Sequence, residues 1–79
     1  MKSYDEQRQF FEGAWPKLDP LARAGDPQGL VSAIEQEPDE AERRVLFAFG
    51  RQRLLDVSVT PNGLELLIAL GEAAEREAQ

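Results

Sequence analysis

The sequence predicts an all-α fold, a compact bundle of about four helices plus one short helical turn. Alanine, leucine and glutamate contribute ten residues each, and all three favour helices. Apolar residues recur at spacings of three and four along much of the chain. The pairs Asp19-Pro20, Asp26-Pro27 and Thr60-Pro61 have the form of helix starts, with a capping side chain before a proline. At 79 residues, we expect one small helical domain spanning residues 1–79.

The N-terminal part of the chain is expected to form one helix and one separate turn. Ser3 can cap a helix that runs to about Ala14. Gly13 and Pro16 are expected to weaken the helix there. Proline lacks the N–H that would bond to the carbonyl four residues earlier. The short helical turn then covers residues 19–24.

The middle of the chain predicts two further helices. Asp26 can cap a helix that runs to about Gln36, with Pro27 in its first position. The next helix is expected over residues 39–55, with acids in its first turn. Gly50 costs about 1 kcal/mol in a helix interior, so we expect a break or kink there.

The last helix is expected to begin at Thr60-Pro61 and to end in a polar helical tail, residues 72–79, that frays. Before it, residues 56–59 alternate in polarity and suit either a linker or a short strand. The predicted core consists of apolar residues from every segment: Phe10, Phe11, Trp15, Leu18, Leu21, Leu30, Ile34, Val45, Ala48, Phe49, Leu64, Leu67 and Ile68.

An α+β fold with a C-terminal β-hairpin or meander around residues 45–70 is the alternative. Residues 45–49, 53–60 and 64–70 would then be strands, and Asn62-Gly63 would form the hairpin turn. Against this alternative, residues 64–68 do not alternate cleanly in polarity, and the sequence from Glu72 onward favours a helix.

Composition excludes several classes of function. The chain has no cysteine and no histidine, so thiolate metal sites, cysteine nucleophiles and histidine bases are ruled out. We expect no catalytic residues, no metal and no cofactor. No apolar run is long enough to cross a membrane, and none follows Met1 as a signal peptide would, so we expect a cytoplasmic protein.

Charge is distributed unevenly, and one stretch stands out. The formal net charge is −6. Five acids without a base fall between residues 35 and 42, and these are the candidate partner-binding residues: Glu35, Glu37, Asp39, Glu40 and Glu42. They suit docking of a basic protein surface. The competing interpretation is that they are ordinary first-turn acids, which the helix dipole stabilises.

Two other constellations are weaker. Four arginines surround Phe47 and Phe49 between residues 43 and 53, a pattern that can bind single-stranded nucleic acid. The acidity of the rest of the chain disfavours a polyanion, and core phenylalanines with paired arginines explain the block better. Ser32 could carry a phosphopantetheine arm as in an acyl or peptidyl carrier, but it falls in mid-helix rather than at a helix start.

We therefore expect a non-enzymatic protein-binding module, most simply a small acidic inhibitor, immunity protein or antitoxin acting on a basic protein partner. In size, acidity and helical class, the chain resembles the small acidic bundles that serve as bacteriocin immunity proteins, without sharing a motif. An adaptor or small subunit of a larger complex is the alternative, and a carrier-like protein is a remote one. Nucleic acid and membrane partners are disfavoured, and the sequence leaves the oligomeric state open.

Overall fold

A computed structural model describes residues 3–56 and 62–78 of the chain, and it confirms the all-α prediction. Four helices follow one another: α1 (Tyr4–Arg23), α2 (Pro27–Glu35), α3 (Glu40–Asp56) and α4 (Gly63–Ala78). The described residues contain no strand, and residues 45–49 and 64–70 are helical, so the α+β alternative is wrong. The expected linker at residues 57–59 and helix start at residues 60–61 lie outside the described residues.

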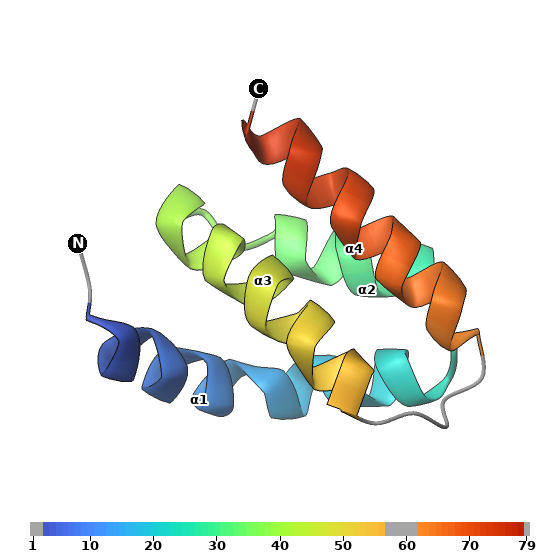
Figure 1. The fold of residues 1–79 in the computed structure, drawn as a ribbon, viewed down its shortest axis with the longest axis horizontal. Helices are drawn as coiled ribbons and strands as arrows, with labels where there is room; N and C mark the ends of the chain where they lie inside the picture. The colour runs from blue at the N-terminus through green and yellow to red at the C-terminus, as the bar shows by residue number, and fades with distance from the viewer. Residues whose placement is uncertain (1–2, 57–61, 79) are drawn as a thin grey trace.

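Helix α3 lies at the centre of the arrangement. It contacts α1, α2 and α4, and its contact with α4 is the most extensive in the molecule. Figure 1 shows α1 along one edge, α4 running beside α3 toward the C-terminus, and α2 passing behind α4. One apolar core joins the four helices.

Helix α1 differs from the expectation, because it continues through both prolines. Ser3 and Glu6 form a capping box at its start, and Pro16 and Pro20 lie inside it. The short turn expected over residues 19–24 is therefore the last part of α1. Both prolines are exposed and four residues apart, so the carbonyls that lose their donors lie on the solvent side, where water can replace the bond.

The turn between α1 and α2 forms as the sequence predicts. Gly25 adopts the left-handed conformation, with φ of 68°, and ends α1. Asp26 then caps α2, because its Oδ1 accepts a hydrogen bond of 3.0 Å from the Gly29 backbone nitrogen. Asn62 fastens the start of α4 to this turn, since its Nδ2 donates to the Gly25 carbonyl over 3.0 Å.

Helix α3 shows no break at Gly50, contrary to the expectation. The glycine is buried where three elements meet. A Cβ at this position would lie 3.3 Å from Cζ3 of Trp15 and 3.6 Å from Cδ1 of Leu70. The glycine therefore permits α3 to pack closely against α1 and α4, at the cost of some helix propensity.

The predicted core is right for α1 and α2 and partly wrong for α3 and α4. Phe11, Trp15, Leu18, Leu30 and Ile34 are buried, and Phe10, Leu21, Val45, Phe49 and Leu67 are half-buried. Ala48, Leu64 and Ile68 are exposed instead. The buried positions that the prediction missed are Ala22, Val31, Leu46, Phe47, Leu54, Leu66, Leu70 and Ala73.

The polar C-terminal tail is helical, as the sequence predicts, and helix α4 extends to Ala78. Glu77, near the end of α4, is half-buried and forms a bidentate ion pair with Arg43 of α3. None of the helices in the described part of the chain is long and apolar enough to cross a membrane.

Candidate functional site

The five acids predicted to bind a partner lie around the connection between α2 and α3, but they have different surroundings. Glu35 is exposed in the last turn of α2, and Glu37 is half-buried in the connection. Asp39 immediately precedes α3, and Glu40 and Glu42 lie in its first turn. The first-turn interpretation therefore explains Glu40 and Glu42 and does not explain Glu35, which is at the unfavourable end of its helix.

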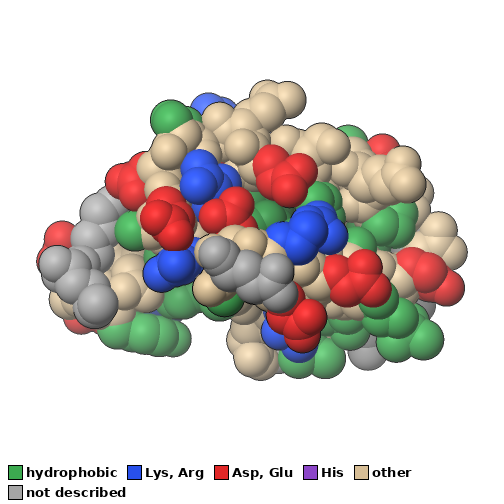
Figure 2. All heavy atoms as spheres, turned by 90° about the horizontal axis from the view of Figure 1, so that it is seen from above, with side chains coloured by type: hydrophobic (Ala, Val, Ile, Leu, Met, Phe, Trp, Pro, Cys, Tyr) green, Lys and Arg blue, Asp and Glu red, His purple; other side chains and the backbone are tan. Residues whose placement is uncertain are grey.

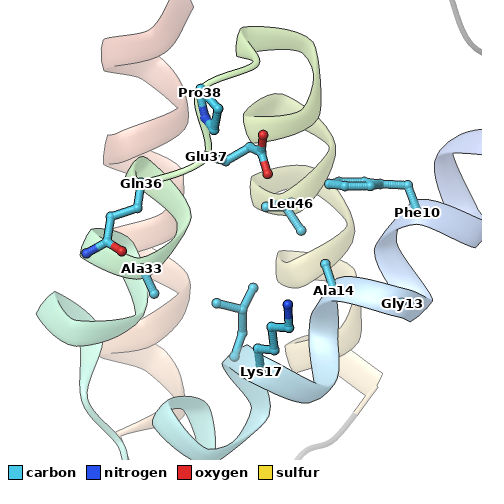
Figure 3. A pocket seen from close by; sticks show the side chains of 10 residues that line it. Phe10, Gly13, Ala14, Lys17, Ala33, Gln36, Glu37, Pro38 and Leu46 are labelled. Atoms are coloured by element: carbon cyan, nitrogen blue, oxygen red, sulfur yellow. The ribbon is translucent and has the colours of Figure 1, made fainter.

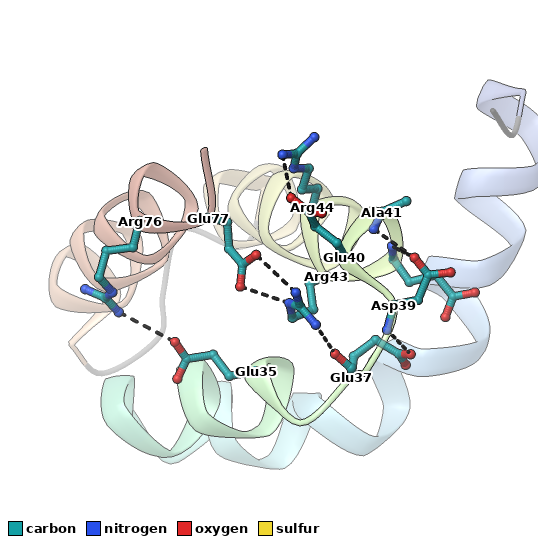
Figure 4. Close-up of polar contacts among 10 residues, drawn as sticks. Glu35, Glu37, Asp39, Glu40, Ala41, Arg43, Arg44, Arg76 and Glu77 are labelled. Carbon is teal, nitrogen blue, oxygen red and sulfur yellow. Dashed lines mark hydrogen bonds and ion pairs between the residues drawn. The ribbon is translucent and has the colours of Figure 1, made fainter. Parts of the chain in front are cut away.

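Arginines are interspersed among these acids (Figure 4). Arg44 pairs with Glu40 over 2.8 Å within α3, and Arg76 of α4 lies 3.8 Å from Glu35. Such exposed pairs contribute between 0 and about 1 kcal/mol each. Figure 2, which views the molecule from above, shows acidic and basic side chains intermingled on that face rather than a continuous acidic surface.

Arg43 organises the centre of this region. Its Nε donates to Oε1 of Glu77 over 2.9 Å, its Nη2 donates to Oε2 of the same residue over 3.3 Å, and its Nη1 donates to the Glu37 backbone carbonyl over 2.6 Å. These bonds join the α2–α3 connection to the end of α4. The hydrogen bonds to Glu77 raise the pKa of the Arg43 guanidinium, so it stays charged.

Two of the five carboxylates bind backbone groups instead of arginines. Oε1 of Glu37 accepts from the Asp39 backbone nitrogen over 3.3 Å. Oδ1 of Asp39 accepts from the Ala41 nitrogen over 2.9 Å and from the Glu42 nitrogen over 3.5 Å, which caps α3. Neither carboxylate has an ion pair within the described residues. Counting Glu77 as a sixth acid against Arg43, Arg44 and Arg76, the region has a formal net charge of −3.

A hollow of about 490 Å³ adjoins this acidic region, and Glu37 belongs to both (Figure 3). Its lining comes from α1, α2, α3 and the α2–α3 connection: Phe10, Gly13, Ala14, Lys17, Leu18, Ala33, Gln36, Glu37, Pro38 and Leu46. Leu18 and Leu46 are buried, whereas Lys17 is exposed. Gly13 is the one lining residue that is unusual in the sequence, because glycine is unfavourable inside a helix, but this signal does not by itself indicate a hollow.

The two phenylalanines of the arginine block of α3 pack on the core to different extents. Phe47 is fully buried and Phe49 is half-buried against Phe11, with ring centroids 5.6 Å apart. Arg53 pairs with Glu12 of α1 and lies over the Phe11 ring, 5.3 Å from its centroid. Three of the four arginines, Arg43, Arg44 and Arg53, therefore pair with acids, as the competing interpretation expects.

Three further side chains with possible functional roles, Ser32, Trp15 and Tyr4, lie in different surroundings. Ser32 is exposed inside α2, five residues after Pro27, and is not at the helix start that a carrier protein would need. Trp15 is 5% exposed and belongs to the core, whereas Tyr4 is 68% exposed and contacts Phe49. Among the described residues, no group of three or more acidic side chains is arranged to hold a metal ion.

Comparisons with protein-family models, with curated proteins and with solved structures found no match to this chain.

Proposed function

We propose that this protein is a non-enzymatic protein-binding module, a small acidic inhibitor of the immunity or antitoxin type that acts in the cytoplasm on a partner with a basic surface. The observation that best supports the proposal is the pair of carboxylates on Glu37 and Asp39, which bind backbone N–H groups and no arginine among the described residues. Lysines or arginines of a partner could approach both without displacing an internal ion pair.

The surrounding charge favours the same kind of partner. Glu35, Glu40 and Glu42 add negative charge around the connection, and the whole chain has a formal net charge of −6. The arginine pairs at Glu35 and Glu40 are exposed, so a partner can exchange them at little cost. Charge complementarity of this kind acts mainly by increasing the rate of association.

The test is the dependence of the association rate on salt, measured by stopped-flow mixing with the partner that copurifies from the source cell. Raising ionic strength from 0.01 M to 0.15 M shortens the screening length from about 30 Å to about 8 Å. We expect association to slow by about tenfold or more, as in electrostatically steered complexes. An association rate that does not change with salt would contradict the proposal.

A second candidate is an adaptor or small subunit, and exposed apolar residues favour it. Leu64 and Ile68 are one turn apart on α4 and are 68% and 51% exposed, and Leu55 of α3 is 59% exposed. Such residues suit contact with an apolar face of another subunit. Leu64→Lys with Ile68→Lys would then abolish partner binding, whereas the inhibitor function predicts that this variant binds normally.

A further inference from the structure

The hollow beside the acidic region has an apolar floor and a rim with opposite charges. Leu18 of α1 and Leu46 of α3 form the floor, at 6% and 4% exposure. Figure 3 shows the Lys17 amine on the α1 side of the hollow and the Glu37 carboxylate on the α2–α3 side, with the Phe10 ring near Leu46. The volume of about 490 Å³ lies within the range of pockets that hold side chains or small ligands.

Gly13 is the feature of this hollow that packing within the chain does not explain. Three other glycines have a structural reason: Gly25 has a positive φ, a Cβ on Gly29 would collide with its helix cap, and one on Gly50 would crowd Trp15. A Cβ on Gly13 would meet nothing within 4 Å. A glycine inside α1 costs about 1 kcal/mol relative to alanine, so its effect here is to keep the wall of the hollow low.

The charges on the rim indicate what kind of group could enter. Glu37 has no ion pair among the described residues and lies beside Asp39, so the α2–α3 side attracts a cation. The opposite side presents Lys17, which repels one and favours a carbonyl or carboxylate. An apolar side chain would pack against the apolar floor of the hollow. A basic residue next to it would pair with the Glu37 carboxylate on the rim.

We infer that the hollow receives an apolar side chain from a basic segment of the partner protein, which enters over Gly13 and places a lysine or arginine beside Glu37. This inference rests on the proposed function. It adds a buried apolar contact with the partner, which charge alone does not provide. Steering by charge sets how fast the partner arrives, whereas a buried apolar anchor determines how slowly it leaves.

The test uses a random dodecapeptide library displayed on phage and selected against the full chain. Synthetic versions of the enriched peptides are then titrated by NMR and by fluorescence. We expect peptides that combine one large apolar residue with a nearby lysine or arginine. Their amide shifts should centre on Gly13, Ala14, Ala33 and Leu46, and replacing the apolar residue by alanine should weaken binding by about tenfold.

Matched variants of the chain locate the binding site. Gly13→Leu places a side chain over the hollow and should weaken peptide binding by about tenfold or more, whereas Gly13→Ala adds a single methyl group to the wall and should weaken binding clearly less. Ala33→Met, which narrows the hollow from α2, should repeat the effect of Gly13→Leu. Circular dichroism establishes that each variant is folded. Glu37→Gln should weaken binding about threefold, because one charged contact at a rim contributes less than the anchor.

Three results would overturn the inference. The selection could enrich no peptide, or the peptides could bind Gly13→Leu and Ala33→Met as well as the natural chain. Alternatively, the NMR amide shifts of the hollow residues could change with protein concentration in the absence of peptide. That result would show that a second copy of the chain fills the hollow. If basic peptides bind undiminished to Gly13→Leu and lose binding when Glu37 and Glu40 are reversed to lysine, the hollow is excluded and the proposed function stands.

Discussion

Glycines show how the same residue type serves opposite purposes at different positions of this chain. Gly13 and Gly50 both lie inside helices, where glycine is unfavourable. Gly50 is buried against Trp15 and Leu70, while Gly13 borders open space. The sequence shows only that both should weaken a helix. The distances to neighbouring side chains distinguish a glycine required by packing from one that packing does not require.

A matched pair of substitutions tests this distinction. Gly13→Leu should increase the free energy of unfolding by about 0.5–1 kcal/mol, because a better helix former enters open space. Gly50→Leu should decrease it by about 1–3 kcal/mol, because the added side chain overpacks the contact with Trp15. Urea denaturation followed by circular dichroism measures both. Equal effects of the same sign would contradict the account of Gly50.

The two neighbouring phenylalanines of α3 give a second prediction. Phe47 is fully buried, whereas Phe49 is half-buried against the core, although the predicted core contains Phe49 and omits Phe47. Phe47→Ala should therefore cost about 3–5 kcal/mol, and Phe49→Ala clearly less. If Phe47→Ala is too unstable to measure alone, both can be compared in the Gly13→Ala background. A larger loss of unfolding free energy for Phe49→Ala than for Phe47→Ala would show that α3 buries the face that carries Phe49 instead.

At the scale of elements, the sequence predicts where helices begin better than which face each one buries. Residues 64, 66–68 and 70 of α4 are all large and apolar, so they cover most of its circumference. Periodicity alone favours Leu64, Leu67 and Ile68 as the buried face. Packing against α2 and α3, together with the Asn62 bond to Gly25, instead buries Leu66, Leu70 and Ala73. The run from Val45 to Phe49 in α3 is ambiguous for the same reason.

Helix α1 shows the opposite case, because it continues through Pro16, which the sequence predicts to weaken it. Its apolar face packs Phe11, Trp15 and Leu18 into the core across the position of Pro16. This burial outweighs the lost hydrogen bond, which would face water in any case. Helix ends at proline are therefore predictable only where no apolar face continues beyond the proline.

Replacing Pro16 tests this explanation. Pro16→Ala restores a donor for the Glu12 carbonyl within a helix that is already continuous. The gain of about 3 kcal/mol in helix propensity exceeds the roughly 1 kcal/mol by which proline restricts the unfolded chain. We expect the free energy of unfolding to increase by at least about 1 kcal/mol in chemical denaturation. A decrease would mean that the proline is required for the geometry of α1.

For the whole molecule, the acids of the candidate site are predictable from the sequence and their pairing is not. Glu35, Glu37, Asp39, Glu40 and Glu42 fall close together because they are close in the chain. The arginine that contacts Glu35 comes from α4, so only the tertiary fold could reveal it. The hollow beside Glu37 is unpredictable in the same way, because its walls come from three helices.

The central claim is that the partner binds through the acidic region. The most direct test compares how fast two double charge-reversal variants associate with the partner. Glu37→Lys with Glu40→Lys alters that region. Asp5→Lys with Glu65→Lys is the control, because both acids are exposed in first turns of other helices and the net charge changes equally, from −6 to −2. At low salt we expect the first variant to associate about tenfold more slowly and the control within about threefold of the natural chain. Equal slowing in both variants, or none in the first, would contradict the claim.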